Sequence, residues 1–222
     1  MRGESERGKF ITFEGLDGCG KSTQLEKLAA ALRLRRIDVV TTREPGGTVI
    51  GERIRSLLLD SRTRGLASHA EMAMMVASRA QLTAEIIRPE LRAGRWVLCD
   101  RYVDSTEAYQ GAGRELGTES VLQLHRLLCR DLWPDLTILM DSDVNNSVQR
   151  ARQRNRAASG VDENRFERES RAFFQRVHAG YMEIARRESQ RVVVIDARPP
   201  IDVVHEEILA AVKDRLDVTA QV

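Results

Sequence analysis

The sequence predicts an α/β protein in which a five-stranded parallel sheet is covered by helices on both faces. Along the 222-residue chain, five short apolar segments alternate with longer segments of helical periodicity. The apolar segments show almost no alternation of polar and apolar residues, which is typical of strands buried on both sides in a parallel sheet. Ligands of such sheets bind beyond the carboxyl ends of the strands. The residues that follow each strand are therefore the candidates for a functional site.

The first predicted strand, residues 9–14, runs directly into a glycine-rich loop. Gly15 to Ser22 fits the phosphate-binding pattern G-x-x-x-x-G-K-[ST], and a helix is predicted over 23–36. Glycines let successive backbone N–H groups point at one anion, and the start of a helix adds partial positive charge. A plain glycine-rich turn is the alternative, but the complete motif between a strand and a helix favours a nucleoside triphosphate site.

In this loop, Lys21 is expected to reach the β- and γ-phosphates, and the Ser22 hydroxyl is expected to help hold Mg²⁺. The predicted triphosphate site comprises Gly15, Leu16, Asp17, Gly18, Cys19, Gly20, Lys21, Ser22 and Thr23.

The rest of the chain alternates in the same way. A strand over 39–43 is followed by the chain breaker Glu44-Pro45-Gly46-Gly47 and by a helix over 48–59. Ser68 and Glu71 have the spacing of a capping box, which predicts the start of a long helix that ends at about residue 91. The remaining strands are predicted over 96–100, 136–141 and 192–196. The remaining helices are predicted over 104–112, 118–130, 144–153, 167–188 and 201–216.

The domain organisation is simple. We expect a disordered lead-in over residues 1–8, a single domain over 9–216 and a short tail over 217–222. Residues 150–165 are rich in arginine, lack clear periodicity and contain the small residues Ala-Ala-Ser-Gly. We interpret them as a lid, because phosphoryl transfer requires that water be excluded and that the charge on the transferring oxygens be neutralised. A solvated basic loop is the alternative.

Composition excludes several classes of function. The chain has 35 basic and 33 acidic residues, so its formal net charge of +2 argues against a strongly basic nucleic-acid-binding protein. The cysteines at 19, 99 and 129 form neither a disulfide framework nor a metal-binding spacing. No apolar run approaches the roughly 20 residues that span a membrane, and we expect no signal peptide. We therefore expect a cytoplasmic protein without nucleic-acid or membrane partners.

Two further strand ends carry chemistry that complements the phosphate loop. Arg43 ends the second strand, and Asp100 closes the third strand just before Arg101. A carboxylate at that position can orient Mg²⁺ beside Ser22, although a helix N-cap is the alternative role. The planar guanidinium groups of Arg43 and Arg101 suit bidentate binding of a second phosphate. Three strand ends thus predict that a nucleoside triphosphate meets a second phosphorylated molecule at one edge of the sheet.

The sequence resembles the thymidylate kinases, a family of nucleoside-monophosphate kinases with the P-loop NTPase fold. The similarity extends from residue 9 to about residue 208. It is carried by Phe13 to Ser22, Thr42 to Thr48, Asp100 to Tyr102, Ser105-Thr106, Ala108 to Gly111, Pro134 to Thr137, Leu139 to Asp141, Phe173-Phe174 and Tyr181. It implies the reaction of ATP with dTMP to give ADP and dTDP, in dTTP biosynthesis, with Mg²⁺, an arginine-rich lid and a homodimer.

The resemblance also implies roles for individual residues. Arg43 and Arg101 would bind the dTMP phosphate, Asp17 would meet the sugar 3′-OH or the magnesium shell, and Arg79 would donate a hydrogen bond to the base. Met75, Thr106, Tyr109 and Gln110 would line the nucleoside pocket, with Tyr109 under the sugar disfavouring a 2′-OH. As in bacterial members, lid arginines would act on the phosphates, most directly Arg152 and Arg154, with Arg150 on the adenine side. Catalysis would depend on Lys21, Asp100, Arg101, Arg152 and Arg154, and Mg²⁺ would be held by Ser22 and Asp100.

Two positions depart from the family pattern. Met75 stands where the family usually has a phenylalanine that stacks on thymine; its polarisable side chain can lie against a ring or simply fill the core. In the lid, which is longer than in compact bacterial members, Asn164-Arg165 replaces the usual pair of an acidic residue and arginine. Two alternatives therefore stay open: a kinase for another (deoxy)nucleotide with looser base selection, and a non-catalytic nucleotide-binding homologue.

Overall fold

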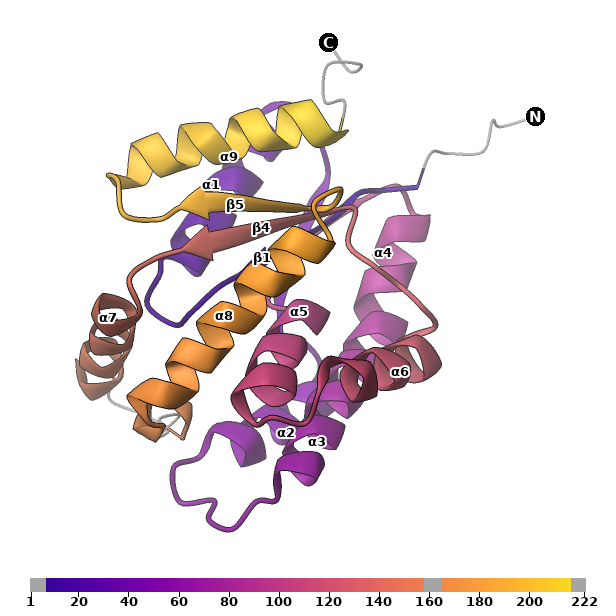
Figure 1. Cartoon of the computed structure of the whole chain (residues 1–222). Helices are drawn as coiled ribbons and strands as arrows, with labels where there is room; N and C mark the ends of the chain where they lie inside the picture. Colours follow the sequence, from indigo (N-terminus) through magenta and orange to yellow (C-terminus); the bar gives the residue numbers. More distant parts are fainter. Residues whose placement is uncertain (1–6, 158–164, 217–222) are drawn as a thin grey trace.

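The computed structural model describes residues 7–157 and 165–216, except for the side chains of residues 152 and 154–157. Most of the predicted lead-in, residues 158–164 of the predicted lid and the predicted tail lie outside the described residues. The described chain forms an α/β structure around a five-stranded parallel sheet with the order β2-β3-β1-β4-β5 (Figure 1). The strands are β1 Phe10–Glu14, β2 Val39–Arg43, β3 Trp96–Asp100, β4 Leu136–Asp141 and β5 Val192–Asp196.

Strand order determines where a ligand can bind. β1 lies in the centre of the sheet, paired with β3 on one side and with β4 on the other. After β1 the chain passes over the position of β3 to form β2 at one edge of the sheet. After β3 it passes β1 in the opposite direction to form β4. In parallel sheets, ligands bind at such a switch point, beyond the carboxyl ends of the strands. Here that place lies beyond Glu14 and Asp100, the last residues of β1 and β3.

Helices cover both faces of the sheet, with α1 and α9 on one face and α4, α5 and α8 on the other (Figure 1). The α-helices are α1 Lys21–Leu34, α2 Val49–Leu59, α3 Ser68–Leu82, α4 Arg88–Arg92, α5 Val103–Thr106, α6 Thr118–Cys129, α7 Val144–Ala157, α8 Arg171–Arg187 and α9 Ile201–Leu216. Two π-helical segments, η1 Thr83–Ile87 and η2 Glu107–Gly113, and one 3₁₀ segment, η3 Phe166–Arg168, complete the described chain.

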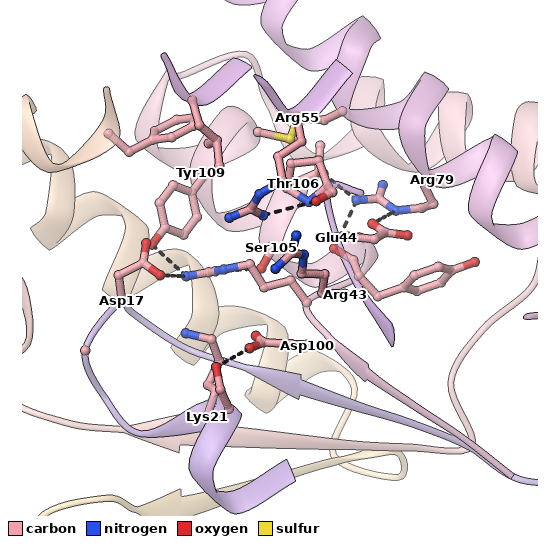
Figure 2. Close-up of a pocket in the computed structure, with 18 of the residues that line it drawn as sticks. Asp17, Lys21, Arg43, Glu44, Arg55, Arg79, Asp100, Ser105, Thr106 and Tyr109 are labelled. Atoms are coloured by element: carbon pink, nitrogen blue, oxygen red, sulfur yellow. Dashed lines mark hydrogen bonds and ion pairs between the residues drawn. The ribbon is translucent and has the colours of Figure 1, made fainter. Parts of the chain in front are cut away.

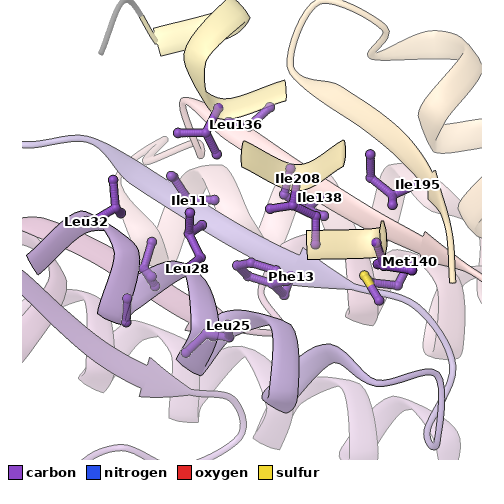
Figure 3. Close-up of a cluster of buried hydrophobic side chains, with 14 of the residues drawn as sticks. Ile11, Phe13, Leu25, Leu28, Leu32, Leu136, Ile138, Met140, Ile195 and Ile208 are labelled. Carbon is purple, nitrogen blue, oxygen red and sulfur yellow. The ribbon is translucent and has the colours of Figure 1, made fainter. Parts of the chain in front are cut away.

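The two faces of β1 bury different kinds of side chain. Ile11 and Phe13 point into an apolar core that Leu25 and Leu28 of α1 and Ile208 of α9 complete (Figure 3). On the opposite face, Phe10 packs against Tyr102, and the polar residues Thr12 and Glu14 are also fully buried. Burial on both faces explains why the strand sequence does not alternate.

The predicted strands match the structure to within one residue, whereas several helix boundaries differ. α1 begins at Lys21 rather than at 23, because the phosphate loop passes directly into the helix. The long helix expected from residue 68 continues to Arg92, but it is interrupted by the π-helical segment η1. α7 extends to Ala157, so the first half of the predicted lid is helical. η3 precedes α8, which begins at Arg171 instead of 167.

The expectation of a capping box at Ser68 and Glu71 is wrong. The N-cap residue of α3 is Ala67, and no side chain caps this helix end. The Glu71 carboxylate instead accepts hydrogen bonds from Gln110, Arg114 and Arg165. Two cationic donors bind a carboxylate more strongly than a backbone N–H does. The Glu71 side chain therefore binds these distant residues instead of capping its own helix.

Close packing of η2 against α8 gives a stability prediction. A Cβ atom at Gly113 would lie 2.7 Å from Phe173 Cε2 and 2.8 Å from Val177 Cγ2, and both side chains are buried. We expect Gly113→Ala to lower the free energy of unfolding by about 1–3 kcal/mol through overpacking, as measured by urea denaturation. The exposed Ser120→Ala substitution on α6 should change it by no more than about 0.5 kcal/mol. Equal stability of Gly113→Ala and the wild type would contradict this close contact between η2 and α8.

Candidate active site

A cavity of about 390 Å³ lies beyond the carboxyl ends of β1, β2 and β3. Its volume is in the range of small-molecule sites. The phosphate loop forms one side, and Arg79, Glu44 and Thr106 lie on another (Figure 2). Fourteen residues of the predicted site line it: Asp17, Gly18, Gly20, Lys21, Ser22, Thr23, Arg43, Met75, Arg79, Asp100, Arg101, Thr106, Tyr109 and Gln110.

The loop between β1 and α1 has the geometry of an anion cradle. Gly20 is the N-cap residue of α1, and no side chain caps the first N–H groups of the helix. The backbone approaches α7 so closely that a Cβ atom at Gly18 would lie 2.4 Å from the carbonyl oxygen of Ser147. Lys21 is buried and donates from Nζ to the carbonyl oxygens of Gly15 and Leu16, at 3.0 and 2.9 Å. The loop thus holds the Lys21 side chain close to the backbone N–H groups of the loop, where an anion would bind.

Ser22 and Asp100 form a pair of hard oxygen donors beside the loop. The Ser22 hydroxyl donates to Asp100 Oδ2 at 2.7 Å. No group of three or more His, Cys, Asp or Glu that could hold a metal ion occurs in the described part of the chain. Mg²⁺ in nucleotide enzymes is commonly bound through one or two protein oxygens together with phosphates and water. The donor set therefore fits Mg²⁺ bound with a nucleotide.

Arg101 lies where the loops after β1 and β3 meet. Its guanidinium group donates to Asp17 at 3.0 Å, to Ser105 at 2.8 Å and to the Tyr181 hydroxyl at 3.0 Å. It also lies over the Tyr109 ring, 5.0 Å from the ring centroid. Its backbone has φ 72°, a left-handed conformation that costs a non-glycine residue roughly 1–2 kcal/mol. Such strain at a cavity is common at functional sites.

Arg43 lines the same cavity, and its side chain is more exposed than that of Arg101. It pairs with Glu52 of α2 at 3.1 Å, and Glu52 in turn accepts a hydrogen bond from the Gly47 backbone N–H. Both arginines line the same cavity as Lys21. The structure therefore brings the three strand ends together, as their shared edge of the sheet predicts.

Arg79 is a buried cation, and one of its three guanidinium nitrogens has no hydrogen-bond partner among the described residues. Its side chain is 2% exposed; Nε donates to Glu44 at 2.8 Å, and Nη2 donates to the Tyr102 carbonyl oxygen and to Thr106 Oγ1. Nη1 is buried without a hydrogen-bond partner among the described residues. A buried N–H group without an acceptor is costly, and Arg79 as a residue lines the cavity, so its guanidinium group is a candidate to bind an acceptor on a ligand there.

Comparisons with known proteins identify the family. The model of the thymidylate kinase family matches residues 13–208. The thymidylate kinase of Desulfovibrio desulfuricans is 51% identical over 197 residues, which cover 88% of this chain and 91% of the relative. That of Pelobacter propionicus is 44% identical, over 96% of this chain and 98% of the relative. The crystal structure of thymidylate kinase from Ehrlichia chaffeensis superposes with a TM-score of 0.75 at 33% identity, covering 93% of this chain and 99% of that one.

The chain belongs to the thymidylate kinase family. Enzymes of this family phosphorylate dTMP to dTDP with ATP. The expected P-loop NTPase fold and the expected enzyme class, a nucleoside monophosphate kinase, are both confirmed. Among the helices of the described residues, none has the length and apolarity that crossing a membrane requires.

Some residues of the predicted site do not face the cavity. Leu16 and Cys19 of the phosphate loop are buried and do not line the cavity, and Gly15 is likewise absent from the lining. Arg150 is exposed on α7, and its Cβ lies 3.2 Å from the position that a Cβ at Gly18 would occupy. It therefore lies beside the loop rather than in the cavity. The side chains of Arg152 and Arg154 lie outside the described residues.

Sequence reasoning missed two buried carboxylates, Glu44 in the cavity wall and Glu14 behind it. In the sequence Glu14 is only the end of a predicted strand, yet it accepts hydrogen bonds from the Tyr102 backbone N–H, Ser105 and Tyr181. Burial, together with the nearby Asp104 carboxylate, raises the pKa of Glu14 to about 7 against the opposing effect of Ser105. Burial likewise raises the pKa of Glu44 to about 7, although Arg79 opposes it. A polar residue within an apolar strand is the signal that could have indicated Glu14.

The raised pKa of Glu14 predicts a pH-dependent contribution to stability. Because the folded protein holds the proton more tightly than the unfolded chain, the contribution is complete below the unfolded pKa of 4.5 and is lost as the pH rises through about 7. We expect the free energy of unfolding of the wild type, relative to that of Glu14→Gln, to decrease from pH 5 to pH 8. Urea denaturation of both proteins at the two pH values measures this difference. A constant or growing advantage of the wild type would contradict it.

Proposed function

We propose that this chain transfers the γ-phosphate of ATP to the phosphate of dTMP, and that the dTDP formed serves dTTP biosynthesis. One observation carries the proposal: the phosphate loop, two arginines and a buried arginine with an unused donor line a single cavity. A protein that only bound a triphosphate would not need a second phosphate-binding group opposite the loop. Family membership supports the same reaction.

At the donor end, the loop N–H groups bind the ATP phosphates, and Lys21 contacts the β- and γ-phosphates. Ser22 and Asp100, whose side-chain oxygens are 2.7 Å apart, would hold Mg²⁺ together with the nucleotide, and the ion would supply charge neutralisation at the phosphate oxygens. Both reacting groups are preformed phosphates, so no general base is needed, and catalysis consists of positioning and charge neutralisation. The assignment of Arg152 and Arg154 to the transferring phosphate, and of Arg150 to the adenine side, rests on the sequence resemblance alone.

At the acceptor end, Arg101 and Arg43 bind the dTMP phosphate, and Asp17, which pairs with Arg101 at 3.0 Å, approaches the sugar. Tyr109 lies under the sugar, and Met75, Thr106 and Gln110 line the nucleoside end of the cavity. Arg79, which lines the same cavity, donates a hydrogen bond to a carbonyl oxygen of the base. Thymine offers a carbonyl where cytosine has an amino donor, so cytosine would leave Arg79 facing a second donor.

Base selection gives the direct test of this function. With ATP as the donor, we expect kcat/KM for dTMP to exceed that for dUMP, dCMP and dGMP when all four are assayed side by side. The value of kcat/KM for dCMP should be at least about 100-fold lower than that for dTMP, because a buried donor would lose its acceptor. Equal rates for dTMP and dCMP would contradict the role of Arg79 and would favour a kinase with loose base selection, which Met75 in place of phenylalanine would permit.

The two ends of the cavity can be separated by substitution. Arg101→Ala should raise the dissociation constant of dTMP by about 10-fold or more, because it removes a charge-assisted phosphate contact, and should change that of ATP much less. Isothermal titration calorimetry with each nucleotide alone measures both. Arg198→Ala removes a guanidinium group at an exposed Asp196 ion pair and should change neither constant. If Arg101→Ala lost affinity only for ATP, the assignment of the ATP and dTMP ends of the cavity would have to be reversed.

We infer further that residues 9–216 form one domain, that the chain is a cytoplasmic homodimer, and that it binds neither nucleic acid nor membranes. The neighbouring Leu127 and Leu128 of α6 are 74% and 47% exposed, and exposed apolar groups of this kind favour a protein interface. Sedimentation equilibrium at micromolar concentration should give twice the mass of one chain. A mass equal to one chain would contradict the dimer.

A further inference from the structure

A buried carboxylate lies directly behind the nucleoside end of the cavity. Glu71, in the first turn of α3, is 1% exposed, and its two oxygens accept four hydrogen bonds. Oε1 accepts from Gln110 Nε2 at 2.7 Å and from Arg114 Nε at 3.1 Å. Oε2 accepts from Arg114 Nη2 at 3.1 Å and from Arg165 Nη1 at 2.7 Å. Since a carboxylate has about four acceptor sites, the hydrogen-bonding capacity of Glu71 is fully used.

Glu71 is ionised in the folded protein. Burial by itself raises its pKa, but the hydrogen bonds from Arg114, Gln110 and Arg165 outweigh that effect, and the pKa is lowered. The same charge keeps two guanidinium groups together, since Arg114 and Arg165 both bind Oε2. Arg114 has a second carboxylate partner, Glu169, at 2.7 Å. Removing the charge of Glu71 would therefore leave two partly buried cations with insufficient neutralisation.

Two partners of Glu71 lead to the wall of the cavity. Gln110 lines the cavity itself. Arg165 immediately precedes Phe166, another lining residue, and its guanidinium group lies 4.4 Å from the centroid of that ring. Phe166 in turn contacts Tyr109 edge to face, with 5.7 Å between ring centroids. Glu71 thus supports the wall on two sides without lining the cavity.

Arg165 also connects Glu71 to a third segment of the wall. Its backbone N–H donates to the Leu59 carbonyl oxygen at 3.2 Å, and its Nε donates to the carbonyl oxygen of Leu58. Leu59, the last residue of α2, lines the cavity. Arg165, which directly precedes η3, thus joins this segment to the end of α2 and the start of α3, which are about a hundred residues earlier in the sequence.

We propose that Glu71 is a positioning residue for the nucleoside monophosphate: by holding Gln110 and Arg165, it fixes the wall that Gln110, Phe166 and Leu59 form around the nucleoside. This inference rests on the proposed function, because it takes that end of the cavity to be the dTMP end. None of Gln110, Phe166 and Leu59 belongs to the phosphate loop, so we expect Glu71 to act on the affinity for dTMP much more than on that for ATP.

Glu71→Gln tests the role with little change in shape. The amide keeps one acceptor oxygen, but it removes the charge and turns an NH₂ donor towards other donors. We expect the dissociation constant of dTMP, measured by calorimetry without ATP, to rise by about tenfold or more, since small displacements of positioning groups have large effects. The constant for ATP should change by less than about twofold.

Arg165→Met provides a second, independent variant, because it keeps the apolar stem at a partly exposed position and removes only the guanidinium group. It should weaken dTMP binding in the same direction. In free-energy terms, the double variant Glu71→Gln, Arg165→Met should lose less dTMP affinity than the sum of the two single losses, because both substitutions remove the same ion pair. If Glu71→Gln does not fold, as judged by circular dichroism, Arg165→Met carries the test.

Glu107→Gln is the matched control. Glu107 lies on η2, as Gln110 does; it is 3% exposed and binds Arg187 through both oxygens, at 2.7 and 2.9 Å. Neither Glu107 nor Arg187 lines the cavity. This variant should lose thermal stability, as Glu71→Gln does, and should bind dTMP within about twofold of the wild type.

Unchanged dTMP affinity in both Glu71→Gln and Arg165→Met would overturn the proposal, whatever their melting temperatures. An equal loss of dTMP affinity in Glu107→Gln would also overturn it, because general loosening of η2 would then explain the effect. A wild-type protein that binds no dTMP would instead contradict the proposed function, so failure of the two proposals can be told apart.

Discussion

The pairing of β1 with β3 is the constraint on which the site depends. Phe13 lies opposite Asp100, and the Phe13 carbonyl oxygen accepts a hydrogen bond from the Arg101 backbone N–H, at 2.9 Å. This register carries the two chain segments out of the sheet together. As a result, Ser22 reaches Asp100, and Asp17 reaches Arg101, although more than seventy residues separate the members of each pair. A slip by one residue would reverse the side of the sheet to which each side chain points.

Buried ionisable groups lie in the wall of the cavity and directly behind it. Arg79 with Glu44, and Glu71 with its two arginines, are ion pairs from which water is largely excluded, and Glu14 is fully buried. Burying charge is unfavourable, and such pairs are weak evidence for net stability. Their hydrogen bonds indicate a different role, which is to orient side chains that line the cavity. Glu44 orients Arg79 in this way, and Glu14 orients Ser105.

The π-helical segment η2 illustrates how the same layer shapes the wall. It carries Tyr109 and Gln110, two lining residues, and it packs on α8 through the close contact of Gly113 with Phe173. π-helical turns are less favourable than α-helical ones and occur frequently at functional sites. Here the wider turn occurs where one side of the segment must meet α8 while the other side presents polar groups to the cavity.

The sequence by itself determined the fold class, the strands and the cluster of strand-end residues. Strand burial and the phosphate loop are local patterns: a two-sided buried strand shows an uninterrupted apolar run, and the loop motif needs only consecutive residues. Because the carboxyl ends of parallel strands share one edge, Lys21, Arg43, Asp100 and Arg101 could be expected at one cavity.

Only the tertiary structure decided the partners of the buried charges. Glu71 has the spacing of a helix cap, and its role as the acceptor for Arg114 and Arg165 depends on segments 43 and 94 residues away. The unused donor of Arg79 and the raised pKa of Glu14 depend in the same way on burial by distant elements. The local sequence determines secondary-structure propensity and motif spacing. Desolvation and pairing of charged side chains arise only when segments that are remote in sequence pack together.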